Sequence, residues 1–435
     1  MKILLLPAYF YPEQAASSYL GDNIRQGLCE SGIELDLYAP IPTRGVSEEV
    51  RQEYKNRSIE QWYDGKMIVH RFSMYAEGKN PILRALRYVL CWCKHFYYGW
   101  RAKDIDLIYL ASTPPIQGVL GGLLKKIKKV PFVYNLQDIF PDSLAGTGLA
   151  KKGGLLWKIG RVIENFTYRN ADKIIVISED FKRNIMAKGV PEEKIVVVYN
   201  WVDEEAVKHV PREENVLFDR YGLDRSKFYI TYCGNIGLTQ NLQMLTEVAK
   251  EMEVNEDIQF VLVGNGAYKE ELERIIQDKQ IKNITLLPFQ PYEEISHVFS
   301  MGDASLVISK PGVGENSVPS KTWSILSASR PVLANFDENE LKTIVDENQC
   351  GIFTKAGDKE AFKQAIMDLY NDRERCKQLG KNGREFILKN LTRAVGTQKY
   401  VDVIKSFDKS NAKTTYTQTP DPRGFDGGDM LRKKR

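Results

Sequence analysis

The segment 309–324 gathers residue types that bind phosphate and sugar hydroxyls. A single carboxylate, Glu315, lies in a glycine-bearing loop after an apolar run, and the position of Pro319 predicts the first turn of a helix. The amides of Ser320 and Lys321 would then point out of a helix N-terminus, which attracts phosphate, and Lys321 adds a full charge. A carboxylate beside a phosphate cradle is what a nucleotide-sugar site needs. An ordinary strand–loop–helix turn with a surface lysine is the alternative.

Short, continuous apolar runs separated by helical segments supply the framework for this loop. Such runs are typical of strands covered on both faces, and strands that alternate with helices indicate a parallel sheet. The runs are 3–6, 35–38, 67–69, 107–110, 132–134, 174–177 and 195–198 in the first half, and 229–233, 260–263, 284–287, 306–308 and 332–334 in the second. The two series predict an α/β protein with two doubly wound Rossmann-like domains. The domains should face a central cleft, because open sheets bind ligands beyond the carboxyl ends of their strands.

A charged stretch that contains Pro211 separates the two series of runs. We therefore expect one Rossmann-like domain over residues 1–205 and a second over 206–385. A C-terminal helix should follow over 386–408. From 409 to 435 Thr, Pro, Gly, Lys and Arg dominate, which predicts a disordered basic tail.

The composition excludes several classes of protein. The chain has 435 residues, of which 43% are hydrophobic and 27% charged, and its net charge of +4 is too small to make the whole molecule a nucleic-acid binder. Six scattered cysteines and four histidines lack zinc-site spacing, so we expect reduced thiols and no metal. The apolar start before Pro7 is too short for a signal peptide, and no apolar run approaches the roughly 20 residues of a membrane span. These features favour a cytoplasmic protein.

An ordered set of motifs carries a family resemblance over roughly residues 1 to 400. The motifs are Ala171–Ser178, Gly189–Pro191, Tyr199–Asp203, Tyr232–Gly237, Val261–Gly266, Leu287–Gln290, Glu315–Lys321 and Arg330–Val332. Together they resemble the retaining GT-B glycosyltransferases of family four. The chain looks most like the bacterial branch that builds O-antigen and capsule, including fucosamine-transferase-like enzymes.

The resemblance implies that the N-terminal domain, 1–205, binds the acceptor and that the C-terminal domain, 206–385, binds the nucleotide-sugar donor. It implies that Glu315 contacts hydroxyls of the donor sugar and that Ser317, Val318, Ser320 and Lys321 belong to the same loop. The turns at Gly234, Gly237 and Gly264 would approach the diphosphate, and Pro288 and Phe289 would shape the base pocket. Many relatives have arginine and lysine where this chain has Asn235 and Gln240. Lys310 and Lys321 are therefore the cations expected to compensate the diphosphate charge.

Other departures from the family pattern concern the ribose and the acceptor. A glutamate that often binds ribose is replaced by Trp323 or Ser324, depending on the alignment. Family members often have His-Asp where this chain has Gln137-Asp138, and a neutral amide cannot act as a general base. A retaining route, in which the leaving phosphate assists the acceptor, would tolerate this change. Asp138 would then orient the acceptor, or cap a helix. Glu13 is a second acceptor-facing candidate.

Residues 81–103 combine basic and aromatic side chains and contain no acid. The residues expected to face a membrane are Arg84, Arg87, Trp92, Lys94, Trp100 and Arg101, and the lysines at 125, 126, 128 and 129 add charge. A basic, aromatic helix can lie in the interface of an anionic membrane. The family's acceptor in this branch is often a sugar on a polyprenyl diphosphate, so the resemblance implies a peripheral position on the inner face of the cell membrane. A core helix with ordinary surface charges is the alternative.

The motifs together predict a retaining glycosyltransferase that moves a sugar from a nucleotide donor, most simply a UDP-sugar, to a lipid-linked or growing glycan. No Asp-x-Asp motif stands in a plausible donor loop, because Asp104-Ile-Asp106 precedes a strand, so we expect no metal or other cofactor. A nucleotide-sugar epimerase and a non-catalytic donor-binding subunit are the rival functions. No nucleic-acid recognition motif accompanies the positive charge.

Overall fold

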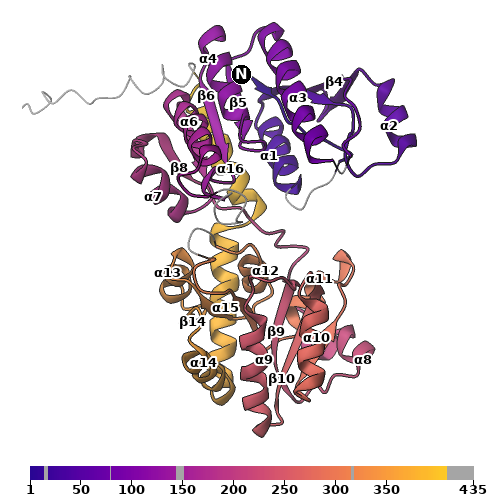
Figure 1. Ribbon diagram of the computed structural model, residues 1–435, viewed down its shortest axis with the longest axis vertical. Coiled ribbons are helices and arrows are strands. Elements are labelled where there is room, and N and C mark those ends of the chain that lie inside the picture. Colours follow the sequence, from indigo (N-terminus) through magenta and orange to yellow (C-terminus); the bar gives the residue numbers. More distant parts are fainter. Residues whose placement is uncertain (14–17, 79, 144–150, 315–317, 409–435) are drawn as a thin grey trace, which may run out of the picture.

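The computed structural model describes residues 1–13, 18–78, 80–143, 151–314 and 318–408 and consists of two stacked α/β units (Figure 1). In the N-terminal unit the strand order is β3-β4-β2-β1-β5-β6-β7-β8, and every pairing except the antiparallel β3–β4 pair is parallel. The strands are β1 (Lys2–Leu5), β2 (Glu34–Pro40), β3 (Ile59–Trp62), β4 (Met67–Phe72), β5 (Leu107–Ala111), β6 (Phe132–Leu136), β7 (Lys173–Val176) and β8 (Ile195–Val197).

The sheet of the C-terminal unit is parallel throughout, in the order β11-β10-β9-β12-β13-β14. Its strands are β9 (Phe228–Asn235), β10 (Ile258–Asn265), β11 (Ile284–Leu287), β12 (Ala304–Ile308), β13 (Val332–Phe336) and β14 (Gly351–Lys355). The order runs outward from β9 in both directions, which is the doubly wound arrangement and leaves a switch point between β9 and β12. The predicted fold class is confirmed.

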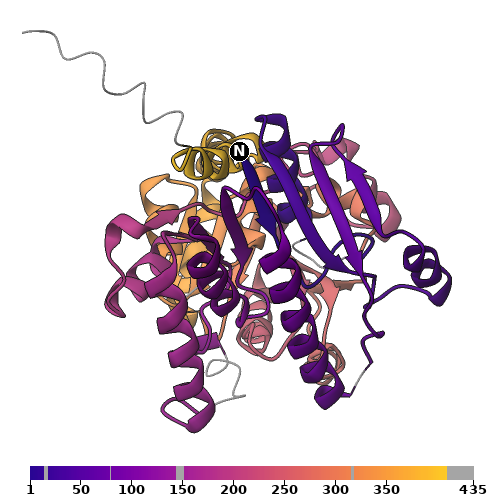
Figure 2. The same ribbon diagram turned by 90° about the horizontal axis from the view of Figure 1, so that it is seen from above.

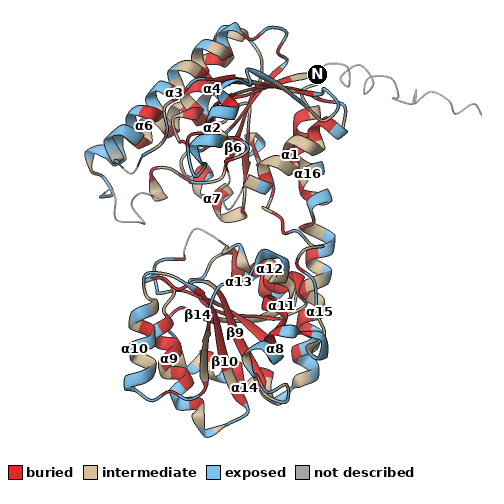
Figure 3. Ribbon diagram, turned by 90° about the vertical axis from the view of Figure 1, so that its right-hand side faces the viewer, coloured by how far each residue is buried: buried red, intermediate tan, exposed pale blue. Residues whose placement is uncertain are grey.

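Helices cover both faces of each sheet, so the strands are buried on both sides (Figure 3). The helices of the N-terminal unit are α1 (Ser18–Glu30), α2 (Glu48–Lys55), α3 (Pro81–Arg101), α4 (Gln117–Lys128), α6 (Leu155–Asn170) and α7 (Glu179–Ala187). Those of the C-terminal unit are α8 (Val216–Tyr221), α9 (Leu242–Glu251), α10 (Lys269–Asp278), α11 (Ile295–Ser300), α12 (Lys321–Ser327), α13 (Glu340–Glu347), α14 (Lys359–Asn371) and α15 (Arg373–Asn390).

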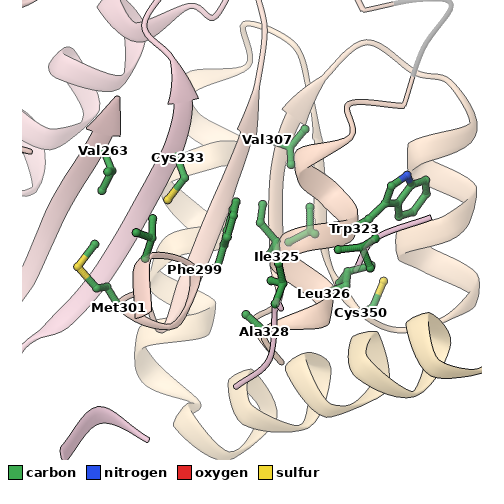
Figure 4. Packing of buried hydrophobic residues seen from close by; sticks show 14 of the residues in the cluster. Cys233, Val263, Phe299, Met301, Val307, Trp323, Ile325, Leu326, Ala328 and Cys350 are labelled. Carbon is green, nitrogen blue, oxygen red and sulfur yellow. The ribbon is translucent and has the colours of Figure 1, made fainter. Parts of the chain in front are cut away.

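One apolar cluster fills the face of the second sheet that supports the loops after β9 and β12. Figure 4 shows Cys233 and Val307 on these strands, with Phe299, Ile325 and Leu326 packed against the sheet from α11 and α12. All five are less than 9% exposed. Burial of this kind contributes about 25 cal/mol per Å² of apolar surface, so the loops at this edge stand on a rigid base.

The last described helix, α16 (Arg393–Lys405), leaves the C-terminal unit and packs on α1 of the N-terminal unit (Figure 1). A Cβ on Gly396 would overlap the ring of Trp201, which is 1% exposed in the segment that joins the units. The expected helix over 386–408 is therefore two helices, because α15 ends at Asn390 and Thr392 caps the amide of Val395 at the start of α16. The tail at 409–435 lies outside the described residues.

Loops at the carboxyl ends of the two sheets meet across the units. Glu340 begins α13 after β13, and its carboxylate accepts hydrogen bonds from the Tyr199 hydroxyl and from the amide of Glu179, at 2.8 Å. Its own amide donates to Asp180 Oδ2 at 2.9 Å, at the start of α7 after β7. The carboxyl edges of both sheets therefore face one another, as the sequence predicted.

None of the helices in the described parts of the chain combines the length and the apolar content needed to cross a bilayer.

Candidate functional site

The donor-binding residues predicted from the sequence lie at the carboxyl ends of four neighbouring strands. The sheet order places the ends of β11, β10, β9 and β12 side by side. Phe289 follows β11, Gly264 ends β10, Gly234 ends β9 and Lys310 follows β12. This edge is the one where open α/β sheets bind ligands, so the fold brings together residues that span more than seventy positions of the chain.

The two predicted glycine turns are direct neighbours. Gly234 and Gly264 stand opposite each other in the β9–β10 register. A Cβ on Gly264 would overlap the carbonyl oxygen of Gly234, and Gly234 itself has a φ of 138°. Both positions therefore require glycine, one for close approach and the other for its backbone conformation. Gly234 is half-buried and Gly264 is buried, so the two turns pack closely against each other at this edge.

Amide side chains, rather than cations, surround the turn after β9. A Cβ on Gly237 would lie 2.5 Å from Asn235 Nδ2 and 2.6 Å from Gln240 Oε1, so both amides lie against this glycine. Gln240 Oε1 is buried and accepts no hydrogen bond from the described residues. These amides can donate to phosphate oxygens, but they bring no charge.

Lys321 is the cation that the structure brings to this edge. Its ammonium lies 4.0 Å from the centroid of the Tyr232 ring, and its Nζ is 3.5 Å from the place of a Cβ on Gly234. The described residues supply neither a carboxylate nor a hydrogen-bond acceptor to it. Burial lowers the pKa of Lys321 to about 8, and the ring quadrupole offsets only part of the lost hydration. Lys321 is therefore a partly buried cation that no carboxylate of the described residues pairs with, which makes it a candidate for binding an anion.

Three further residues of this edge escaped the sequence analysis. Tyr232 stacks under Lys321 and donates its hydroxyl to the carbonyl of Asn235 at 2.6 Å, which fixes the turn. The hydroxyls of Ser309 and Thr322 are buried and have no partner among the described residues. Tyr232 lies inside a motif that the analysis used only for its glycines, and an unpaired hydroxyl has no signature in a sequence.

The loop before Glu315 is fastened to the next strand connection. Asp337 accepts hydrogen bonds from the amides of Gly312, at 2.9 Å, and Gly314, at 2.7 Å. Asn339 donates to the carbonyl of Gly314 at 2.7 Å. Glu315 and Ser317 lie outside the described residues, so their predicted roles stay predictions.

On the other side of this loop the helix begins slightly later than expected. Helix α12 starts at Lys321 rather than Pro319, and Ser320 occupies its N-cap position without a side-chain hydrogen bond. Ser320 is exposed and Val318 half-buried against the core. Trp323 is 5% exposed and packs edge-on against Tyr199, so this position belongs to the core and offers nothing to a ribose.

Pro288 and Phe289 are both exposed beyond β11, and the Phe289 ring is 60% exposed. An exposed ring at the end of the strand next to the glycine turns can stack on a planar base. The two base-recognition candidates thus lie at the edge formed by the carboxyl ends of β11, β10, β9 and β12, which we call the donor edge after its predicted role.

In the N-terminal unit, the side chain of Gln137 belongs to a hydrogen-bond network and is not free. It donates to Asn135 Oδ1 at 2.8 Å and accepts from Asn200 Nδ2 at 2.9 Å. Tyr400 of α16 donates to the same Asn135 oxygen at 3.1 Å. The adjacent Asp138 is exposed after β6 and lines a small hollow with Ile163 and Thr167 of α6.

The prediction that Glu13 contacts an acceptor is wrong. Its carboxylate is 7% exposed and accepts four hydrogen bonds, from the amides of Phe10, Thr43 and Arg44 and from the Thr43 hydroxyl. These donors occupy the lone pairs that an acceptor hydroxyl would need. Glu13 therefore fastens the loop after β1 to the loop after β2.

A largely apolar cavity of about 240 Å³ opens between α1 and the carboxyl ends of β1, β5 and β6. Tyr9, Arg25 and Tyr109 line it, together with Asn135 and Gln137 of the network. The sequence analysis did not find it, because its lining comes from five separate elements, α1, β1, β2, β5 and β6.

The membrane-facing residues predicted on α3 divide into two groups. Trp100 is 56% exposed, and Arg84 and Arg101 are also exposed. Lys94 is half-buried and donates to the carbonyl of Ser73 at 2.5 Å. Trp92 is half-buried and donates to the carbonyl of Ile116 at 3.1 Å.

The prediction that Arg87 faces a membrane is wrong, because its side chain is fully buried. It donates to the Thr43 hydroxyl at 2.6 Å and to the Ala8 carbonyl at 3.1 Å, and it pairs with Glu77 at 3.7 Å. Two of the four lysines at 125, 126, 128 and 129 also have polar partners within the protein. Lys125 pairs with Asp172 at 2.7 Å, and Lys128 donates to the carbonyls of Trp100 and Ala102.

Across the described ranges, no group of three or more His, Cys, Asp or Glu side chains is placed to hold a metal ion. The six cysteines form no disulfide, and five of them are buried.

Comparisons with known proteins agree with this architecture. Residues 22–206 match the family model described as Glycosyltransferase Family 4, and residues 213–386 match the one described as Glycosyl transferases group 1. Among solved structures, Anabaena HepE in complex with UDP-glucose superposes with a TM-score of 0.66 at 17% identity, covering 93% of this chain and all of that one. That likeness shows a shared fold.

Curated relatives are similar in sequence over most of the chain. The putative colanic acid biosynthesis glycosyl transferase WcaI of Escherichia coli is 31% identical over 335 residues, which cover 75% of this chain and 81% of WcaI. The probable glycosyltransferase WbjE of Pseudomonas aeruginosa is 24% identical over 310 residues, 70% of this chain and 76% of WbjE. With both units matched by their family models and the fold shared throughout, this chain belongs to the group 1 glycosyltransferases with the GT-B fold.

Proposed function

We propose that the protein transfers a sugar from a UDP-sugar to a lipid-linked or growing glycan in surface polysaccharide biosynthesis, with retention of the anomeric configuration. The observation that carries the donor assignment is the partly buried ammonium of Lys321, which has no partner among the described residues and lies beside the turns at Gly234 and Gly264. A diphosphate would supply the missing negative charge. HepE, which shares the fold, has been solved with UDP and with UDP-glucose.

In this proposal the donor lies along the edge formed by β11, β10, β9 and β12. The uracil stacks at Phe289, the diphosphate lies between the glycine turns and Lys321, and the sugar reaches the loop that Asp337 fastens. Asn235, Gln240 and the free hydroxyls of Ser309 and Thr322 donate to phosphate oxygens, in place of the cations that many relatives have. Glu315 orients the sugar hydroxyls.

The acceptor approaches from the N-terminal unit. The cavity of about 240 Å³ receives part of it, and Asp138 orients the attacking hydroxyl. Gln137 is a neutral amide whose oxygen already accepts from Asn200, so it does not remove the acceptor proton. The leaving phosphate takes that proton, which is the route consistent with retention. The polysaccharide role is supported by the name of WcaI, a putative colanic acid biosynthesis glycosyl transferase. A role in O-antigen or capsule assembly is part of this proposal.

The test measures binding and transfer separately. UDP should bind and raise the melting temperature, since a ligand specific for the native state stabilises it, and Glu315→Gln should abolish sugar transfer without reducing UDP binding. Near-normal turnover in Glu315→Gln would remove Glu315 from the site. UDP binding without transfer to any lipid-linked glycan would instead indicate a donor-binding subunit, and free epimerised sugar formed without acceptor would indicate an epimerase.

A further inference from the structure

An exposed apolar surface covers the outer sides of α3 and α6. On both helices exposed aliphatic and aromatic residues recur at helical spacing. This α3/α6 surface consists of Ile82, Leu83, Leu86, Val89, Leu90, Tyr97 and Trp100 on α3, and of Leu155, Leu156, Ile159 and Val162 on α6. Leu155 is 75% exposed and Val162 69% exposed. A helix that packs only on its own domain turns such residues inward, so this face is built for contact with something else.

The two helices are held in a fixed arrangement. Figure 2 shows α3 and α6 on the same side of the N-terminal unit, with their first turns at the same edge. Helix α4 contacts both of them. A Cβ on Gly99 of α3 would lie 2.7 Å from Leu124 of α4, and one on Gly118 of α4 would overlap Thr167 of α6. Such close packing leaves little room for independent movement, so the two apolar stripes act as one surface.

The charges around this surface have one sign. Helix α3 contains no acidic residue, and the single acid of α6, Glu164, is 4% exposed and pairs with Arg161 and with Lys188. Lys151 and Lys152, just before α6, and Lys158 within it are exposed. Apolar side chains flanked by cations are the pattern of helices that lie in the interface of an anionic bilayer.

The same pattern argues against a second copy of this chain as the occupant. If two copies met through this face, the exposed lysines of α6 would gather at the contact, and neither α3 nor α6 would offer an exposed acid to meet them. Like charges at a contact oppose association. A bilayer with anionic headgroups satisfies both the apolar side chains and the lysines.

The inner side of α3 leads directly to the cavity at the carboxyl ends of β1, β5 and β6. Arg87, on the buried side of α3, donates to the Ala8 carbonyl at 3.1 Å and lies 4.5 Å from the Tyr9 ring centroid. Ala8 and Tyr9 both line the cavity. One helix therefore borders both the exposed apolar surface and the wall of the proposed acceptor cavity.

We propose that the α3/α6 surface inserts its aliphatic side chains into an anionic bilayer, with α6 an insertion element in its own right alongside α3. The cavity beneath α3 then lies next to the membrane from which a lipid-linked sugar arrives. This last point rests on the proposed function for the identity of the acceptor, whereas bilayer insertion itself does not.

Vesicle flotation tests the insertion. The wild-type protein is floated with vesicles of phosphatidylcholine containing about 30% phosphatidylglycerol, beside the double variant Leu155→Ser/Val162→Ser. The matched control is Val254→Ser, because Val254 is 93% exposed on the C-terminal unit. Partition should fall at least about tenfold in the α6 double variant and stay unchanged in the control. The triple variant Lys151→Gln/Lys152→Gln/Lys158→Gln should lose the preference for phosphatidylglycerol.

If the α6 double variant bound to the vesicles as well as the wild-type protein does, the proposal would be overturned. A concentration-dependent dimer that this variant abolishes while vesicle binding persists would also overturn it. UDP binding serves as the second measurement in every variant, and it should stay at the wild-type level. If UDP does not bind the wild-type protein while flotation behaves as expected, the proposed function fails and the membrane surface stands.

Discussion

The ammonium of Lys321 lies 4.0 Å from the centroid of the Tyr232 ring, and no carboxylate in the described part of the chain pairs with it. The ring lies on β9 and the lysine at the start of α12, so the contact joins two of the elements that form the donor edge. In the proposed function, a bound diphosphate would offset the cost of partly burying this charge. Three predictions concern this lysine.

Replacing Lys321 by methionine should abolish UDP binding and stabilise the unliganded protein. Methionine keeps the length and apolar contacts of the side chain but removes the uncompensated charge. We expect UDP affinity to fall at least about a hundredfold, and unfolding at pH 7 to become harder by on the order of 1–3 kcal/mol, since one pKa unit is worth about 1.4 kcal/mol. Calorimetry and denaturant titration measure the two effects. Lys279→Met, on the exposed end of α10, should change neither.

UDP affinity should weaken as the pH rises through about 8, the value to which burial lowers the pKa of Lys321. A bound diphosphate favours the charged lysine, so the complex takes up a proton in this range and the dissociation constant rises with pH. In Lys321→Met this dependence should disappear. A wild-type dissociation constant that stays flat between about pH 7 and 9.5 would show that the ammonium does not contact the donor.

The stability of the unliganded protein should change in the opposite sense over the same range. The pKa of Lys321 is lower in the folded state, about 8, than the roughly 10.4 of an unfolded lysine. The unfolded chain therefore binds more protons between these values, and this group's contribution to stability grows as pH rises through that window. Comparison of wild type with Lys321→Met isolates this contribution from other titrating groups.

Removal of the Tyr400 hydroxyl should loosen the Gln137 network without affecting the donor edge. Tyr400→Phe loses the 3.1 Å hydrogen bond to Asn135, in a buried setting. The free energy of unfolding should fall by about 1 kcal/mol, while UDP affinity stays the same. Tyr370→Phe is the matched control, because its hydroxyl bonds Asp257 on the surface at 3.1 Å. Equal losses in both variants would mean that the buried network adds no stability.

Glu340→Ala should weaken the contact between the two units. The substitution removes the acceptor for the Tyr199 hydroxyl and for the Glu179 amide, and each buried group left without a partner costs about 1–3 kcal/mol. We expect a lower melting temperature and a larger radius of gyration in X-ray scattering. Glu338→Ala, which breaks only the exposed pair with Lys342 at 3.0 Å, should leave both values unchanged. A wild-type radius for Glu340→Ala would locate the contact elsewhere.

Most of the fold was predictable from the sequence because the strands are buried on both faces. Every apolar run that we identified forms a strand, in the order expected of two doubly wound sheets. The missed strands are β3, at one edge, whose residues alternate between exposed and half-buried, and β14, at the other sheet's edge. The edge strands β8 and β11 contain continuous apolar runs and were found, whereas β3 and β14 are less continuously apolar, so the search for apolar runs did not reveal them.

The candidate site was predictable where backbone geometry dictates the residue type. Gly234 and Gly264 fall in this class, since no other residue fits. Charged residues were harder, because the same carboxylate or guanidinium can face solvent or a buried set of donors and acceptors. Glu13 and Arg87 both looked like surface groups in the sequence, and both are buried and hydrogen-bonded to residues that are distant in the chain. Only the tertiary structure decides between these outcomes.

The chain passes between the two units twice, once just after Trp201 and once between α15 and α16, and the contact of Gly396 with the Trp201 ring joins these two passages. Two neighbouring connections between the units should allow them to rotate about one axis more easily than about the others. We therefore expect the two units to open and close by rotation about a single axis. Such a rotation would bring their facing loops back to the same relative position each time the units close.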